Sequence, residues 1–253
     1  LRLTSLTDAA ARNTTLTYAN ANPLLVTKIT DPFGRFTTLA YDGSGRLSSI
    51  TDVLGITSSF TYDATDTNFI NKLTTPYGDS TFNGGEDYTK NSVWLELTDP
   101  LGKAERLEAT PNAPSINPSE VTVPAGMTVE NDLYNSRNTF VWDKHTNATY
   151  GHSDYTKAQI YHWLTNTDGS TSPILSSLKK SLENRIYFNY PGQDISVPQV
   201  VGTLSAPSAT GRVLDDASTQ LSQATYNGIG KPLTATDPVG RVKQFAYAAN
   251  NVD

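Results

Sequence analysis

The chain has 253 residues, a formal net charge of −6 and no cysteine, which excludes disulfides and thiol chemistry. Its 19 basic residues are outnumbered by 25 acidic ones and are densest at Lys179–Lys180, so we expect no binding to nucleic acid. No apolar run approaches the roughly 20 residues of a membrane helix, and we therefore expect no membrane insertion.

The composition favours strands joined by many short turns. Hydrophobic residues make up 37% of the chain and charged residues 17%, while tyrosine occurs 13 times. Threonine and tyrosine favour strands, and glycine, asparagine and proline favour turns. The sequence therefore predicts an all-β protein.

A repeated spacing begins near the N-terminus and returns near the C-terminus. An aspartate, usually in a Thr-Asp pair, is followed ten residues later by a tyrosine, as in Asp8 to Tyr18. The same step joins Asp31 to Tyr41, Asp52 to Tyr62, and Asp237 to Tyr247. Asp99 has the turn but lacks the tyrosine, and 74–78 looks like a turn that has lost its aspartate. This regularity marks an internal repeat of about 21 residues.

Each box has a physical role in a hairpin. In Asp-Pro-x-Gly, aspartate caps the turn, proline presets φ, and glycine occupies a position with positive φ. We expect strands of about seven to nine residues between the turns, paired antiparallel. The turn and strand residues to which we assign this structural role are Asp31, Gly34, Tyr41, Asp42, Gly45, Asp52, Gly55, Tyr62, Asp99, Gly102, Asp237, Gly240 and Tyr247.

Side-chain alternation predicts how the hairpins stack. Leu39 and Phe60 each lie two residues before a repeat tyrosine and share its face of the strand. No single unit buries that face, so neighbouring units must supply the contact. The predicted fold is a set of stacked antiparallel β-hairpins forming a curved, spiralling partial β-shell, an open wall.

The repeats are interrupted, and the interruptions predict the domain organisation. Residues 1–109 and 211–253 carry the repeats, and 110–126 and 191–210 are proline-rich loops. Residues 127–190 form an atypical block, which we expect to be one long hairpin. Its second half should turn at Thr167–Ser170 and run back over 174–190.

The boxes Thr-Asp-Pro-x-Gly-Arg and Tyr-Asp-x-x-Gly-Arg-Leu resemble those of the YD/RHS repeat family, and residues 182–193 resemble a further block of bacterial RHS proteins. That family includes bacterial RHS polymorphic toxins, the C component of insecticidal toxin complexes, and the teneurins. The resemblance implies a segment of a cargo-enclosing shell in a secreted or cell-surface bacterial protein. The chain starts at Leu1 inside a patterned segment, so we expect a piece of a longer protein. Exposed strand edges would pair with the remainder of that parent protein or with another copy.

A catalytic alternative rests on the histidines of the atypical block. Asp143 and His145 would share a strand face, as would His152 and Asp154, and a turn near Asn147 could bring the four together as an acid–base or metal site of a hydrolase. His162 alternates with apolar residues, so we expect it to pack against the sheet. No cofactor motif and no metal-binding pattern is present, and we expect a non-catalytic protein without cofactor or metal.

A second alternative is binding of carbohydrate. Aromatic side chains can stack on sugar rings, and the atypical block contains five that stand outside the repeat. The candidates are Trp142, Tyr150, Tyr155, Tyr161 and Trp163. Glycans are therefore a further class of partner, beside the leading hypothesis of a structural wall.

Overall fold

The structure is a computed structural model that describes residues 1–111, 123–129, 137–181, 183–196 and 199–248. Residues 112–122 of the predicted loop 110–126 lie outside the described residues, as do 130–136, 182, 197–198 and 249–253. The described chain divides into two compact units. The first comprises residues 1–83 and 96–104, and the second comprises 84–95 and the residues from 105 onward.

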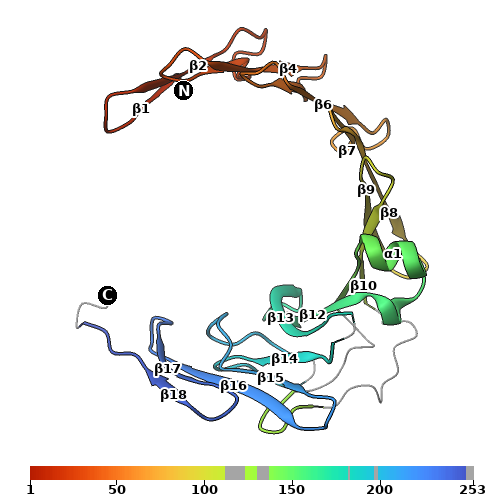
Figure 1. Ribbon diagram of the computed structural model, residues 1–253, viewed down its shortest axis with the longest axis vertical. Helices are drawn as coiled ribbons and strands as arrows, with labels where there is room; N and C mark the ends of the chain where they lie inside the picture. Colours follow the sequence, from red (N-terminus) through yellow and green to blue (C-terminus); the bar gives the residue numbers. More distant parts are fainter. Residues whose placement is uncertain (112–122, 130–136, 182, 197–198, 249–253) are drawn as a thin grey trace. The chain divides into compact units, whose positions relative to one another are not determined.

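The described residues form eighteen strands, which pair antiparallel in chain order as one open sheet (Figure 1). The first ten are β1 (Ser5–Thr7), β2 (Asn13–Thr17), β3 (Lys28–Thr30), β4 (Phe36–Tyr41), β5 (Leu47–Thr51), β6 (Thr57–Tyr62), β7 (Ile70–Thr75), β8 (Gly78–Asp87), β9 (Ser92–Thr98) and β10 (Ala104–Thr110). The others are β11 (Asn138–Trp142), β12 (Gln159–Thr165), β13 (Thr171–Lys179), β14 (Ile186–Asn189), β15 (Ala209–Val213), β16 (Thr219–Tyr226), β17 (Pro232–Thr236) and β18 (Val242–Gln244). The all-β prediction is confirmed.

The repeat strands are shorter than the sequence led us to expect. Strands β1 and β3 have 3 residues each, and β4 and β6 have 6. The expectation of seven to nine residues holds for β9, β10 and β16, which have 7, 7 and 8 residues. It was wrong for β1 to β7, because each turn takes more of the repeat than the Asp-Pro-x-Gly box. Five residues, from the aspartate to the arginine, are used in closing the turn.

One turn geometry recurs nine times among the described residues. The backbone N–H of its first residue donates to the carbonyl of the fifth, and the N–H of the fourth donates back to the carbonyl of the first. This is a type I turn followed by a residue in the left-handed region. The first residues of these turns are Asp8, Asp31, Asp42, Asp52, Asp99, Asn166, Leu214, Asn227 and Asp237.

The fourth position of the turn has positive φ, as predicted from the glycines. Gly45 has φ 79° and Gly240 has φ 83°. Alanine occupies the same position at Ala11 (φ 59°) and Ala217 (φ 65°), which sequence reasoning did not find. The segment 74–78 is a turn of a different kind, because Thr75 pairs directly with Gly78 and leaves a two-residue loop.

The turn predicts a difference between two neighbouring glycines. Gly45→Ala should destabilise the hairpin β4–β5 by about 1–2 kcal/mol, because the Cβ of alanine disfavours the left-handed conformation. An added Cβ there meets nothing closer than a Leu25 methyl at 3.8 Å, so packing adds no penalty. Gly43→Ala is the control, since Gly43 has open space and no positive φ. Urea unfolding followed by circular dichroism measures both, and an equal loss at Gly43 would contradict the assignment.

The sheet of the first unit has no buried core. None of the side chains of residues 1–91 is buried, although this whole range is described. The predicted alternation holds in part. In β2, Leu16 is half-buried between exposed Thr15 and Thr17, and Leu39 and Phe60 are half-buried as well. These strands are therefore stabilised by the hydrogen bonds between them and by contacts between neighbouring hairpins, in place of a buried core.

The buried side chains lie in the second unit, in two clusters. One contains Phe140, Trp142, Tyr155, Ala158 and Ile160 from β11, β12 and the segment between them. The Tyr155 ring meets the other two rings edge to face, with centroids 4.8 Å apart for Phe140–Tyr155 and 5.2 Å apart for Trp142–Tyr155. The other cluster contains Met127, Tyr187 and Ala209.

The block 127–190 differs from the long hairpin that the sequence predicted. Its described residues form four strands, β11 to β14, with helix α1 (Lys144–Tyr150) and the short 3-10 helix η2 (Tyr155–Lys157) between β11 and β12. The turn at 166–170 is present, but the returning segment is split into β13 and β14 instead of running unbroken over 174–190. The described residues between the two strands are Lys180, Ser181, Glu183, Asn184 and Arg185, all of them polar.

Candidate functional site: the junction between hairpins

The repeat tyrosines fasten each hairpin to the chain before it. The hydroxyl of Tyr62 donates to the carbonyl of Leu47 at 2.8 Å, 15 residues earlier. Tyr18, Tyr41, Tyr190 and Tyr247 make the same bond over the same separation of 15 residues. Tyr226 makes a similar bond over 19 residues, to the carbonyl of Pro207 at 2.7 Å. The regular spacing of the repeat therefore places most of these tyrosines within reach of a carbonyl in the preceding hairpin.

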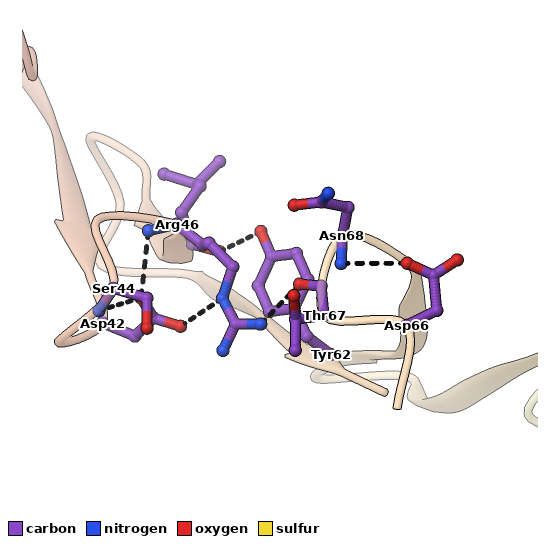
Figure 2. Close-up of polar contacts among 8 residues, drawn as sticks. Asp42, Ser44, Arg46, Tyr62, Asp66, Thr67 and Asn68 are labelled. Carbon is purple, nitrogen blue, oxygen red and sulfur yellow. Dashed lines mark hydrogen bonds and ion pairs between the residues drawn. The ribbon is translucent and has the colours of Figure 1, made fainter. Parts of the chain in front are cut away.

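Figure 2 shows this junction around Tyr62. The guanidinium of Arg46, the residue that directly precedes Leu47, lies 4.4 Å from the ring centroid of Tyr62. Arg46 also donates to the carbonyl of Thr67 in the next loop. One arginine therefore contacts its own turn, the following tyrosine and the loop beyond it.

The cation above the ring recurs where the sequence provides one. Arg2 lies 4.5 Å from the Tyr18 ring centroid, and Lys231 lies 4.9 Å from that of Tyr247. Each cation directly precedes the residue whose carbonyl accepts the tyrosine hydroxyl. Cation–π contacts of this kind contribute roughly 0.5–1 kcal/mol at exposed sites. The arginine of the Tyr-Asp-x-x-Gly-Arg box is thus part of the junction, a role that sequence reasoning had not assigned.

The turn aspartate holds that arginine in position. In the Asp42 turn, Oδ1 accepts the backbone N–H groups of Ser44 and Arg46, and Oδ2 accepts Nε of Arg46 at 2.7 Å (Figure 2). The Arg46 N–H is the main cause that lowers the pKa of Asp42 below its ordinary value, with the guanidinium adding to it against the opposing effect of burial. Asp237 and Arg241 repeat the arrangement.

Tyr190 is a junction residue that lies outside the recognised repeats. Its hydroxyl donates to the Leu175 carbonyl at 2.7 Å, and burial raises its pKa to about 12. The sequence signal was present but altered, because Tyr190 is followed by Pro-Gly-Gln in place of Asp-x-x-Gly-Arg. Strands β13 and β14 therefore keep the junction chemistry of the repeat although the box is lost.

Removing one junction hydroxyl should have a local and measurable effect. Tyr62→Phe loses the bond to Leu47, and we expect a cost of about 1 kcal/mol with faster amide hydrogen exchange in β5 and β6. Tyr77→Phe is the matched control, since Tyr77 is 85% exposed. Exchange that is accelerated equally by both variants, or by neither, would contradict a role for the hydroxyl.

The four acid–base candidates do not lie as the catalytic hypothesis required. Asp143 starts α1, where its Oδ1 accepts the Thr146 N–H at 2.7 Å, and His145 lies within that helix. The expected shared strand face of Asp143 and His145 was therefore wrong. Asp154 starts η2 and accepts the N–H and hydroxyl of Thr156.

Both aspartates act as helix caps. The Thr146 N–H is the main cause of a lowered pKa at Asp143, and the Thr156 hydroxyl is the main cause at Asp154. His152 follows α1 in a bend, outside any strand. Among the described residues, no group of three or more His, Asp or Glu side chains is placed to hold a metal ion. His162 is buried, as expected, with Nδ1 3.0 Å from Asn138 Oδ1.

The five aromatic candidates separate into two kinds. Trp142 and Tyr155 are only 0% and 6% exposed and belong to the core, so they cannot present a face to a ligand in solution. Tyr150 is exposed on α1, with Lys157 Nζ 5.4 Å from its ring centroid. Tyr161 and Trp163 are partly exposed and stack on each other with centroids 6.0 Å apart.

A buried charge network in the second unit was not found from the sequence. Glu108 is 2% exposed, and its Oε1 accepts the Tyr155 hydroxyl at 2.6 Å. Its Oε2 lies 3.2 Å from Arg106, whose guanidinium lies 4.1 Å from the Trp94 ring centroid. Burial and then the Glu108 carboxylate raise the pKa of Tyr155. Alternation along β10 gave no hint of it, because an acidic residue is normally placed on the solvent side.

Comparison with known proteins agrees with the junction geometry. Residues 24–57 and 41–80 match the RHS Repeat family. Within residues 24–80, this chain carries RHS repeats. The matched residues contain the turns at Asp31, Asp42 and Asp52 and the junction tyrosines Tyr41 and Tyr62. No curated protein matches the chain.

Three solved structures are similar to the chain. A crystal structure of TcdB2–TccC3 is 12% identical with a TM-score of 0.32, over 89% of this chain and 15% of that one. A crystal structure of TcdB2–TccC3–TEV is 13% identical with a TM-score of 0.21, over 93% and 18%. A Tc holotoxin pore of Photorhabdus luminescens is 14% identical with a TM-score of 0.20, over 91% and 17%. The RHS-repeat chain thus spans less than a fifth of each.

No helix among the described residues is long and apolar enough to cross a membrane. The longest, α1, has 7 residues.

Proposed function

We propose that this RHS-repeat chain is a non-catalytic wall segment, a strip of sheet that forms part of a shell around a cargo in a secreted or cell-surface bacterial protein. The junction carries the proposal. The same tyrosine bond over 15 residues occurs at Tyr41 and Tyr62 in one unit and at Tyr190 and Tyr247 in the other. Because the same bond joins one hairpin to the next along the chain, hairpins can be added in series to extend the sheet.

The absence of buried side chains from residues 1–91 supports the same role. An enzyme holds its catalytic groups on elements that a packed core keeps rigid. A single layer of sheet instead covers a large surface with few residues, and an enclosing wall requires such a surface.

The partners that we propose follow from the outer strands. In the described residues, β1 pairs with β2 and β18 pairs with β17, which leaves one side of each for another strand. Unpaired strand edges bind further strands readily. We propose that the remainder of a parent RHS protein, or another copy of this chain, continues the sheet there.

A hydrolysis screen tests the non-catalytic role. The purified chain is assayed against chromogenic esters, glycosides and phosphates, with and without a chelator. We expect no turnover above that of a mock purification from the same host. Saturable turnover that survives stringent purification would overturn the proposal, and its loss in Asp143→Asn and His145→Ala variants would locate the activity at the start of α1.

A further inference from the structure

An open groove of about 640 Å³ lies beside Trp163, wholly within the second unit. Its volume falls in the range of sites for small ligands. The lining residues are Asn91, Val93, Ala109, Thr110, Pro111, Arg137, Asn138, Thr139, Trp163, Thr171, Ser172 and Pro173. They come from β9, β10, β11, β12 and β13 and from the residues that adjoin those strands. The junction that supports the wall function does not include this groove.

An aromatic surface forms one wall of the groove. The Trp163 ring is partly exposed and lies nearly parallel to the Tyr161 ring, at an interplanar angle of 14°. Trp163 Nε1 donates to Thr139 Oγ1 at 2.9 Å, which fixes the orientation of the indole. The indole therefore offers a flat apolar face that is held in place before any ligand arrives.

Buried polar side chains line the same groove. Asn138 and Ser172 are each 2% exposed, and Thr110 is 5% exposed. The Asn138 side chain is held at both ends. Its Nδ2–H donates to the Pro111 carbonyl at 3.0 Å, and its Oδ1 lies 3.0 Å from His162 Nδ1. Ser172 Oγ accepts the Ile174 N–H at 3.1 Å. Polar groups that are buried and held by neighbours are typical of a preorganised site.

Two residues at the groove have a strained backbone. Asn91 has φ 52° and Arg137 has φ 59°, two of the four non-glycine residues with positive φ in the described chain. Arg137 Nε donates to the Trp163 carbonyl at 2.8 Å, so this strained residue also supports the aromatic wall.

We propose that the groove binds a carbohydrate, with one face of a pyranose ring on the Trp163 indole and its hydroxyls on Asn91 and Thr139. A sugar ring combines an apolar face with several hydroxyl groups, which matches one aromatic wall beside neutral amide and hydroxyl side chains. Arg137 is the one charged residue among the lining residues. An extended peptide fits less well, because β12 is paired on both sides, with β11 and β13, and offers no free edge there.

Binding is tested with the full chain on an array of immobilised oligosaccharides. The soluble probes cellotriose, maltotriose and chitotriose then follow by calorimetry. We expect saturable binding of at least one sugar. Trp163→Ala should weaken it by about tenfold or more, which corresponds to about 1.4 kcal/mol. Tyr77→Ala should leave it unchanged, since Tyr77 is 85% exposed and does not line the groove.

Two further variants keep the proposal testable if Trp163→Ala does not fold. Asn91→Gly removes the amide while tolerating the positive φ, and Thr139→Val removes the hydroxyl at nearly constant shape. Each should weaken binding several-fold. The proposal is overturned by an array without any bound sugar, by binding that none of the groove variants weakens, or by binding of a proline-rich peptide in place of every sugar. None of these results would alter the wall proposal, which rests on the tyrosine junctions.

Discussion

Replacing Glu108 by alanine should destabilise the second unit by about 3–5 kcal/mol, because it leaves Arg106 as a buried charge without its carboxylate. The Arg106 and Glu108 side chains are only 11% and 3% exposed. Arg106 Nε is already buried without a hydrogen-bond partner. The Tyr155 hydroxyl, which donates to Glu108, would lose its acceptor as well. Urea unfolding followed by tryptophan fluorescence measures the change, since all three tryptophans lie in the second unit.

An exposed ion pair in the same unit provides the control. Arg212 Nη1 lies 3.6 Å from Glu183 Oε2, and the two side chains are 33% and 44% exposed. Glu183→Ala should cost under about 1 kcal/mol, because solvent already screens that pair. Replacing both buried partners, Arg106→Met with Glu108→Leu, should recover most of the loss. A loss at Glu108 no larger than that at Glu183 would show that burial of the pair is not what matters.

Replacing Trp142 by alanine should also cost about 3–5 kcal/mol, through the cavity that it leaves. Trp142 is fully buried between Phe140 and Tyr155, and its Nε1 donates to the Asp154 carbonyl at 3.1 Å. Tyr150→Ala, at a side chain that is 53% exposed, should stay within about 0.5 kcal/mol of the unchanged protein. Urea unfolding followed by circular dichroism measures both variants. If Trp142→Ala cost no more than the control, Trp142 would not be the core residue that the structure makes it.

The repeat was predictable because each of its parts is local in sequence. Asp42, Gly45 and Arg46 form one five-residue turn by themselves, so their spacing alone predicts that turn. The tyrosine step is regular because Tyr62, like most repeat tyrosines, bonds to a carbonyl 15 residues earlier. The spacing did not predict which contacts the tyrosine makes. The bond to Leu47 and the cation above the ring became evident only with the strands in place.

The second unit could not be predicted in the same way, because its contacts join residues far apart in sequence. Tyr155 meets Glu108 across 47 residues, and no local pattern announces such a pair. Asp143 and His145 looked like strand residues, but Asp143 caps a helix that the β-rich surroundings did not favour. Of the aromatic candidates, Trp142 is fully buried whereas Trp163 is partly exposed. Burial of that kind is decided by tertiary packing.

The central claim is that residues 1–83 form a stable sheet without a core, held by their ladder and their tyrosine junctions. Hydrogen exchange over the whole chain, followed by mass spectrometry, tests it most directly. The account predicts protected amides in β3 to β7, where no side chain is buried, as well as in β11 to β15, where the core lies. Protection confined to the second unit, with rapid exchange throughout β3 to β7, would contradict it.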